Sequence, residues 1–299
     1  MPRLIAVLAL LLICPLGRSW AADAAALAYL ASTAEEVNNR LLAKSALLYD
    51  ATTGQVLYAR NIDKPLLPAS TTKLLTALLL YEHNLGLRGA VTVVPGDTWV
   101  EPSHVPLIPG ETVSINVLAH SLLIASDNDS AMALARYVSG SVPAFVSLMN
   151  KRAADLGCTR THFVNPNGLP ARGEYTTARD LLRIFQRTLA IPELREIMQT
   201  KTYWMVTAHG GQLLKNHNKL LGKYPGMGPA KTGWTERSRH TYAASATRDG
   251  HELQLIILNS PDKWKDASLL FNYGFANLPP LPAPPVLESA SAAPSAPAR

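Results

Sequence analysis

A serine and a lysine stand three residues apart in the segment PASTTKLL, where Lys73 follows Ser70. A serine hydroxyl is a weak nucleophile at neutral pH, so an acylating enzyme needs a base beside it and donors that stabilise the oxyanion. On a helix this spacing places the Lys73 amine within reach of the Ser70 hydroxyl. Partial burial favours the neutral amine, which accepts the serine proton. Alone, the pair is a weak signal, because such spacings arise often by chance.

A second polar cluster, Ser126-Asp127-Asn128, interrupts two helical stretches. In a turn or extended backbone, residues two apart point the same way, so Ser126 and Asn128 face one side together. Ser126 is predicted to relay a proton toward a leaving amine, and the Asn128 amide to hold the peptide backbone of a substrate. The alternative is a helix cap for the stretch that starts at Ser130, because Ser, Asp and Asn are all favoured at that position.

A third cluster, Lys231-Thr232-Gly233-Trp234, precedes two strand-like segments near the C-terminal end. Lys231 and Thr232 offer a cation and a hydroxyl to a substrate carboxylate, and Gly233 lets a substrate backbone approach an edge strand closely. The Trp234 amide is expected to face the Ser70 amide, which gives the two donors of an oxyanion hole. Taken alone, the tripeptide also fits an ordinary turn that leads into a strand.

The order Ser-x-x-Lys, Ser-Asp-Asn, Lys-Thr-Gly is characteristic of penicillin-binding proteins and class A β-lactamases. The chain resembles the serine D-Ala-D-Ala carboxypeptidases of peptidase family S11, the low-molecular-mass penicillin-binding proteins, over Ser45 to Leu278. FVNPNGL (Phe163 to Leu169) and YTTARDL (Tyr175 to Leu181) add to the resemblance.

This resemblance implies hydrolysis of peptidoglycan stem peptides through an acyl-enzyme on Ser70. Lys73 is then the base and Ser126 the proton relay, while Lys231 and Thr232 hold the terminal carboxylate. Covalent capture of β-lactams is implied as well.

Three alternatives remain beside the carboxypeptidase. The shorter members of the family include D-Ala-meso-diaminopimelate endopeptidases, and this chain resembles them because a Pro/Ala-rich stretch follows the motifs where many relatives carry a second, β-rich domain. A class A β-lactamase needs a Glu-x-x-x-Asn loop between the second and third clusters, whereas Glu174, Glu193 and Glu196 are followed four residues on by Ala, Ile and Thr. A non-catalytic peptidoglycan-binding protein is disfavoured because every motif residue is present.

Hydrophobic periodicity predicts the elements that position these clusters. Two apolar runs, Ser45 to Tyr49 and Gln55 to Arg60, flank Thr52-Thr53-Gly54 and predict a hairpin. The leucine-rich run Ser70 to Glu82 predicts a buried helix that begins at the nucleophile. Further helices are expected over Ile115–Ile124, Ser130–Val138, Ala144–Leu156, Thr177–Thr188 and Lys263–Phe275.

Strand signals return late, in a hairpin candidate that turns at Gly210-Gly211 and in another that turns at Asp249-Gly250. Strands at both ends with helices between them predict an α/β fold. Its antiparallel sheet is flanked by helices and carries an inserted helical lobe, as in β-lactamases and transpeptidases.

Composition predicts the organisation of the chain. Residues 1–22 have the pattern of a secretory signal peptide, 23–44 of a lead-in helix or linker, 45–278 of the catalytic penicillin-binding domain, and 279–299 of a disordered Pro/Ala-rich tail. The protein is therefore expected to be exported and periplasmic, either soluble or loosely associated with the cell wall, with no membrane-spanning segment.

Other partners are disfavoured. The net charge is +6, but no basic run is interleaved with aromatic residues, which argues against nucleic acid. The eight histidines show no metal-ligand spacing, so neither a metal nor another cofactor is predicted. Cys158, the one cysteine after the signal, is expected to be a small buried residue rather than a reactive thiol.

Overall fold

The computed structural model describes residues 33–84, 86–98, 100, 105, 107–207, 210–278 and 281. The predicted signal peptide, the first ten residues of the predicted lead-in and nearly all of the predicted tail lie outside the described residues. The proposed boundaries of these regions stay predictions.

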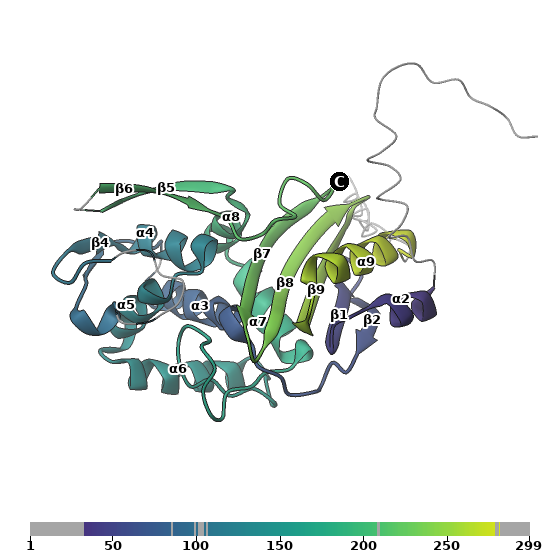
Figure 1. The fold of residues 1–299 in the computed structure, drawn as a ribbon, viewed down its shortest axis with the longest axis horizontal. Coiled ribbons are helices and arrows are strands. Elements are labelled where there is room, and N and C mark those ends of the chain that lie inside the picture. The colour runs from purple at the N-terminus through teal and green to yellow at the C-terminus, as the bar shows by residue number, and fades with distance from the viewer. Residues whose placement is uncertain are drawn as a thin grey trace, which may run out of the picture.

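One five-stranded antiparallel sheet joins the two ends of the described chain (Figure 1). Its spatial order is β2 (Gln55–Arg60), β1 (Ser45–Asp50), β9 (His251–Ser260), β8 (Arg239–Arg248) and β7 (Met227–Thr235). Strand β1 pairs with β9 from Ser45 opposite Leu258 to Asp50 opposite Leu253. The order leaves β7, which carries the third cluster, as an edge of the sheet.

Each face of the sheet has its own core, because alternate side chains of a strand point to opposite faces. Leu255 and Ile257 pack with α9 (Lys263–Ala276) and α2 (Ala34–Arg40) on one face. Ile256 and Leu258 pack on the other face with apolar side chains of the helices that lie between β2 and β7 in the sequence. The sheet is thus covered on both sides, which confirms the predicted α/β class.

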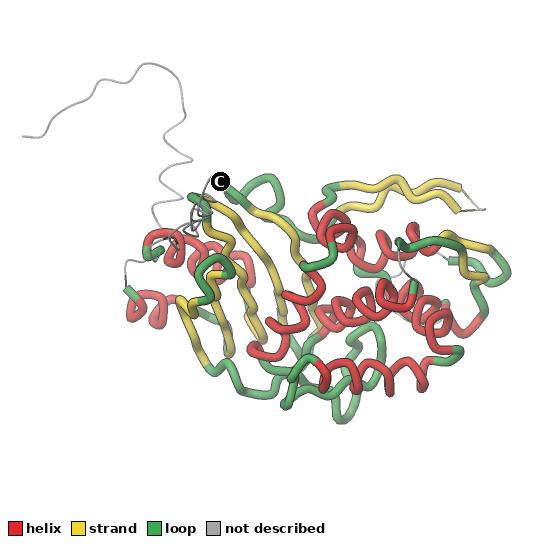
Figure 2. The backbone as a smooth tube through the Cα atoms, turned by 180° about the vertical axis from the view of Figure 1, so that it is seen from behind, coloured by secondary structure: helices red, strands yellow, loops and turns green. Residues whose placement is uncertain are grey.

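Most of the remaining elements form a helical lobe beside β7 (Figures 1 and 2). It contains α3 (Lys73–His83), α4 (Ile115–His120), α5 (Asn128–Ser139), α6 (Val142–Asp155), the short turns η1 (Ala69–Thr72), η2 (Pro95–Asp97) and η3 (Ser121–Ala125), and the small strands β3 (Ala90–Thr92) and β4 (Thr112–Ser114). Helix α7 (Ala178–Leu189) packs against the sheet, and α8 (Pro192–Gln199) leads into the hairpin of β5 (Thr202–Thr207) and β6 (Gly210–Lys215). In both views the hairpin extends over the lobe, away from the main sheet.

The predicted helices are present with shifted ends. Residues Lys73 to Leu80 of α3 are buried all round, as expected for a helix inside the lobe. The stretch from Ile115 changes from α-helix to a π-helical turn at Ser121, a feature often found near functional sites. Helix α5 begins two residues before the predicted Ser130, because the Asp127 side chain caps it.

Three details differ from the prediction. Gly210 and Gly211 are the first residues of β6 and not the turn of the hairpin. Helix α8 and the β3–β4 pair were absent from the prediction, since each is too short for a clear periodic signal. Within the described residues no single helix is long and apolar enough to cross a membrane, while the bent pair α5 and α6 passes that test only together.

Candidate active site

Ser70 lies in the tight turn η1, directly before α3. The Pro68 carbonyl anchors this turn, because it accepts hydrogen bonds from Thr71 Oγ1 at 2.6 Å and from Thr241 Oγ1 at 2.8 Å. Thr241 belongs to β8, so the sheet holds the position of the serine directly. Ala69, next to Ser70, has a positive φ of 48°, a conformation that costs free energy in a residue other than glycine.

The Lys73 side chain is fully buried, and its Nζ has three hydrogen-bond acceptors. It lies 3.0 Å from Ser70 Oγ, 2.8 Å from Asn128 Oδ1 and 2.8 Å from the Asn167 carbonyl oxygen. Burial lowers the pKa of Lys73 to about 7, although the carboxyl groups of Asp127 and Glu174 act in the opposite direction. At neutral pH a large share of this amine is therefore unprotonated.

The three hydrogen-bond partners of Lys73 Nζ determine which proton the neutral amine can accept. An uncharged amine keeps two N–H donors and one lone pair. The Asn128 and Asn167 oxygens accept only, whereas the Ser70 hydroxyl also donates. The two N–H groups therefore go to the asparagine oxygens, and the lone pair of Lys73 points at the Ser70 proton. This geometry suits proton abstraction from the serine.

The Asn167 carbonyl belongs to a turn that packs tightly under the nucleophile. A Cβ atom at Gly168, whose φ is +82°, would lie 1.9 Å from the Ala69 carbonyl oxygen, so only glycine fits there. The side chain of Asn165 closes the turn by accepting from the Gly168 amide at 2.6 Å. The turn therefore holds the Lys73 acceptor against the segment that carries Ser70.

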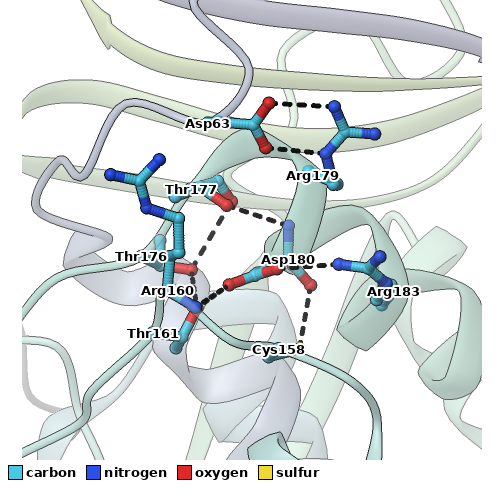
Figure 3. Close-up of polar contacts among 9 residues, drawn as sticks. All are labelled: Asp63, Cys158, Arg160, Thr161, Thr176, Thr177, Arg179, Asp180 and Arg183. Carbon is cyan, nitrogen blue, oxygen red and sulfur yellow. Dashed lines mark hydrogen bonds and ion pairs between the residues drawn. The ribbon is translucent and has the colours of Figure 1, made fainter.

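A polar network at the start of α7 holds the segment from Cys158 to Thr161, which precedes this turn in the chain (Figure 3). The buried Asp180 carboxylate accepts from the Arg160 amide at 2.8 Å, from Thr161 Oγ1 at 2.9 Å and from Arg183 Nη1 at 2.8 Å. Cys158 Sγ donates to the Asp180 carbonyl at 3.4 Å. Cys158 is buried, as expected, and burial raises the pKa of its thiol to about 12, which disfavours the thiolate.

The second cluster lies at the junction of η3 and α5. Ser126 adopts a left-handed conformation, with φ 61° and ψ 31°, and ends the π-helical turn. The carboxylate of Asp127 accepts from the Ser130 amide at 2.8 Å and from the Val105 amide at 2.7 Å. The predicted cap is thus present, but Asp127 supplies it, which leaves the side chains of Ser126 and Asn128 to the site.

The third cluster lies within edge strand β7 rather than in a turn. Lys231 Nζ donates to Ser126 Oγ at 2.7 Å and to the Thr232 carbonyl at 2.9 Å, so the second and third clusters are in direct contact. Burial, with the nearby charges of Lys73 and Lys263, holds the pKa of Lys231 well below its usual value. A Cβ atom at Gly233 would lie 2.8 Å from the Ser70 amide nitrogen. The absence of a side chain there lets β7 pack closely against the backbone of Ser70.

A cavity of about 770 Å³ opens where the clusters meet. Ser70, Ser126, Thr232, Gly233 and Trp234 line it, together with residues of β6 and of the start of α9. Lys73, Asn128 and Lys231 are buried behind that lining. The structure thus brings together all eight residues that the sequence analysis selected. Within the described residues no group of three or more His, Cys, Asp or Glu side chains is arranged to hold a metal ion.

Sequence reasoning missed several cations in this cavity. Lys263 Nζ contacts His240 Nδ1 at 2.9 Å, and it lies 4.5 Å from the centre of the Trp264 ring. Burial and the charge of Lys219 lower the pKa of Lys263 to about 8. His217 also lines the cavity, and burial with the charges of three nearby lysines lowers its pKa to about 4. No local motif marked these residues, since each comes from a different segment.

Glu174 is a second omission. This side chain is 5% exposed, and its charge interacts with that of Lys73. Burial raises the pKa of Glu174 to about 8, so its carboxyl group is mostly protonated at neutral pH.

Comparison with known proteins identifies the family. The family model described as D-alanyl-D-alanine carboxypeptidase matches residues 31–262 of the chain. The chain belongs to the D-alanyl-D-alanine carboxypeptidase family. Among its relatives is the D-alanyl-D-alanine carboxypeptidase DacB2 of Mycobacterium tuberculosis, which is 35% identical over 242 residues that cover 78% of this chain and 82% of the relative. DacF of Bacillus subtilis is 32% identical over 249 residues, and there the matched region spans 78% of this chain but only 62% of the relative.

Solved structures of this carboxypeptidase family have the same fold. The crystal structure of a D-alanyl-D-alanine carboxypeptidase from M. tuberculosis H37Rv superimposes with a TM-score of 0.75 at 34% identity, over 80% of this chain and 93% of the other. A serine-to-alanine mutant of the Streptomyces K15 DD-transpeptidase gives a TM-score of 0.76 at 30% identity, over 79% and 99% of the two chains. The predicted membership of the family and the predicted fold are both confirmed.

Proposed function

We propose that this member of the family is a serine D-Ala-D-Ala carboxypeptidase that cleaves peptidoglycan stem peptides through an acyl-enzyme on Ser70. The observation that carries the proposal is the environment of Lys73. This amine is buried, its pKa is near 7, and its lone pair faces the Ser70 hydroxyl. A general base is most effective when its pKa lies near the working pH.

In the acylation step Lys73 takes the Ser70 proton while Ser70 Oγ attacks the carbonyl carbon of the penultimate D-alanine. The carbonyl oxygen becomes an oxyanion, which the amides of Ser70 and Trp234 stabilise. The close packing of β7 at Gly233 against Ser70, where an added Cβ atom would lie 2.8 Å from the Ser70 amide nitrogen, supports this pairing. Asn128, whose Oδ1 binds Lys73, holds the substrate backbone beside the base.

Collapse of the intermediate breaks the C–N bond and releases the leaving amine. Ser126 gives its proton to that amine and recovers one from Lys231, which lies 2.7 Å away. Water then hydrolyses the ester: its hydroxyl group joins the acyl carbon, its remaining proton re-forms the Ser70 hydroxyl, and net return of one proton from Lys73 to Lys231 restores both lysines. No Glu-x-x-x-Asn sequence lies between Ser126 and Lys231, so the site lacks the deacylating loop of class A β-lactamases. This difference argues against a β-lactamase.

The cations of the cavity suit a peptide that ends in a carboxylate. Thr232 lines the cavity beside the buried Lys231, and Lys263 adds a second positive charge to the same cavity. A charged hydrogen bond to a carboxylate is stronger than a neutral one. We assign recognition of the terminal carboxylate to Thr232, Lys231 and Lys263. A β-lactam also carries a carboxylate and a strained amide, so it acylates Ser70 and is released slowly.

Export belongs to the same proposal. The substrate lies in the cell envelope, and residues 1–22 have a charged start, an apolar core and small residues at the cleavage point. We infer that the mature enzyme acts in the periplasm, either soluble or loosely associated with the cell wall. N-terminal sequencing of the enzyme recovered from the periplasm tests this.

Labelling with a fluorescent penicillin tests the chemistry. The protein should form a stable adduct whose mass matches one acyl group, and Ser70→Ala should form none. The same protein should release D-alanine from a stem pentapeptide. Equal labelling of Ser70→Ala, or no labelling of the folded protein, would overturn the proposal. Rapid nitrocefin turnover without an adduct would point to a β-lactamase.

A further inference from the structure

The cavity at Ser70 is larger than release of one D-alanine requires. D-Alanine has six non-hydrogen atoms, whereas the cavity of about 770 Å³ lies within the range of sites that enclose drug-sized ligands. A recess of about 270 Å³ continues from it under the β5–β6 hairpin, because Val105 and Gln212 line both spaces. Together the cavity and the recess form a continuous space that is larger than one amino acid and extends from Ser70 along the β5–β6 hairpin.

Two strand edges face this cavity. Strand β7 is the edge of the five-stranded sheet, and β6 has only β5 as a partner among the described strands. Six consecutive residues, Gln212 to His217, line the cavity from the β6 side, and Thr232 to Trp234 line it from β7. Successive side chains of a strand point to opposite faces, so a continuous run lines a cavity when the edge of the strand is turned toward it.

The pairing of the hairpin shows which backbone groups point into the cavity. The Asn216 amide donates to the Lys201 carbonyl at 2.9 Å, so these two residues form a hydrogen-bonded pair. Antiparallel pairs alternate between hydrogen-bonded and non-hydrogen-bonded, and Lys215 and Leu213 face Thr202 and Trp204 in the register. The N–H and C=O groups of Leu213 and Lys215 therefore point away from β5, toward the cavity.

The walls favour an anionic peptide. Lys215, Lys219 and Lys263 line the cavity, and its described lining contains no Asp or Glu. The adjoining recess is largely apolar, with Val105, Ile108 and Met205 in its wall. An extended chain with carboxylates and small apolar side chains matches both parts, and a strand edge binds such chains through main-chain hydrogen bonds.

Strand β6 lies on the leaving-group side of Ser70. The His217 amide, two residues after the end of β6, donates to the Ile124 carbonyl at 3.2 Å, which places the end of the strand close to the segment that carries Ser126. In the proposed mechanism Ser126 protonates the leaving amine. The free edge of β6 thus lies close to the residue that protonates the leaving amine.

We propose that the free edge of β6 binds the peptide on the leaving-group side as an added strand, which lets the enzyme accept the second stem peptide of a crosslink as leaving group. The inference rests on the proposed acyl-enzyme chemistry and adds a specificity element to it. Ser70 still forms the ester, and the C–N bond of the crosslink breaks instead of the bond to free D-alanine.

The variant Leu213→Pro tests whether the free edge of β6 binds the peptide on the leaving-group side. Proline removes the N–H that points into the cavity and leaves the β5–β6 hydrogen bonds in place. The matched control is Val206→Pro on β5, because Val206 pairs with Gly211 in the same non-hydrogen-bonded way and its N–H points to the opposite edge of the hairpin. Penicillin labelling and circular dichroism check that each variant is folded.

The measured quantity is the ratio of kcat/KM for crosslinked muropeptide dimers to kcat/KM for monomeric pentapeptide. Leu213→Pro should lower this ratio by about fivefold, the effect of one hydrogen bond, and Val206→Pro should leave it unchanged. An unchanged ratio in Leu213→Pro, or an equal loss in both variants, would overturn the inference. If Leu213→Pro does not fold, the unmodified enzyme is tested with dimers whose leaving-side amides are N-methylated, which should show the same loss.

Failure of the two proposals is distinguishable. An enzyme that binds penicillin and cleaves monomers but leaves dimers intact retains the proposed function and refutes the role of β6. An enzyme that neither labels at Ser70 nor cleaves either substrate refutes the proposed function itself.

Discussion

The pH dependence of acylation reports directly on two lysines of the site. In the proposed mechanism Lys73 acts only when neutral, and its pKa of about 7 lies below the usual lysine value, so acylation should rise as the pH increases through 7. Lys263 binds a carboxylate only when charged, and its pKa is about 8, so recognition should weaken as the pH increases through 8. The rate should therefore reach its maximum between these two values.

The size of the effect follows from the two pKa values. At pH 5 about 1% of Lys73 is neutral, compared with about half at pH 7, which predicts a loss of roughly fiftyfold on the acid side. A lysine with an ordinary pKa would instead give a rate that still rises about tenfold per pH unit at pH 9. His217, with a pKa of about 4, stays neutral over this range and adds no third limb.

The assay is the second-order rate constant for labelling by a fluorescent penicillin from pH 5 to pH 10, with circular dichroism at each pH as a control for folding. Lys263→Arg should keep the acid limb and weaken the alkaline one, because arginine stays charged throughout while Lys231, whose pKa is also lowered, still titrates. An acid limb that moves with the Lys263 substitution, or a rate that still climbs beyond pH 9 in the unmodified enzyme, would refute the assignment of Lys73 as the base.

Two further predictions concern residues that support the site. Gly168→Ala should abolish penicillin labelling and lower the free energy of unfolding by about 2 to 4 kcal/mol, because the new Cβ atom clashes with the Ala69 carbonyl and the residue has a positive φ. The control in the same thermal unfolding assay is Gly96→Ala, whose new Cβ atom would have no other atom within 4 Å. Asp127→Asn should move the acid limb below pH 7, because the carboxylate raises the pKa of Lys73; a limb that moves upward would contradict this.

The sequence predicted the parts of the site that local patterns encode. Ser70 and Lys73 are three residues apart, and the helical backbone converts that spacing into contact. The alternation of the late strands and the Asp249-Gly250 turn predicted β8 and β9, and so the sheet that carries Lys231. In both cases neighbouring residues determined the structure.

What the sequence did not show depends on long-range packing. The Asn167 carbonyl that binds Lys73 is 94 residues away in the chain, and a backbone oxygen leaves no mark in the residue type. Glu174 was considered only as part of a Glu-x-x-x-Asn motif, whereas its importance comes from burial near Lys73. The sequence marks Lys263 only as the start of a helix, and only the fold places it in the cavity.

The position of the three Lys73 acceptors links folding to activity. One comes from η1, one from the start of α5 and one from the turn before Gly168, so the amine has all three only when these segments have packed together. Burial that lowers the pKa of Lys73 is completed by the same packing. A variant that loosens the turn at Gly168 should therefore lose the base by letting water reach it, even when Ser70 and Lys73 keep their helical spacing.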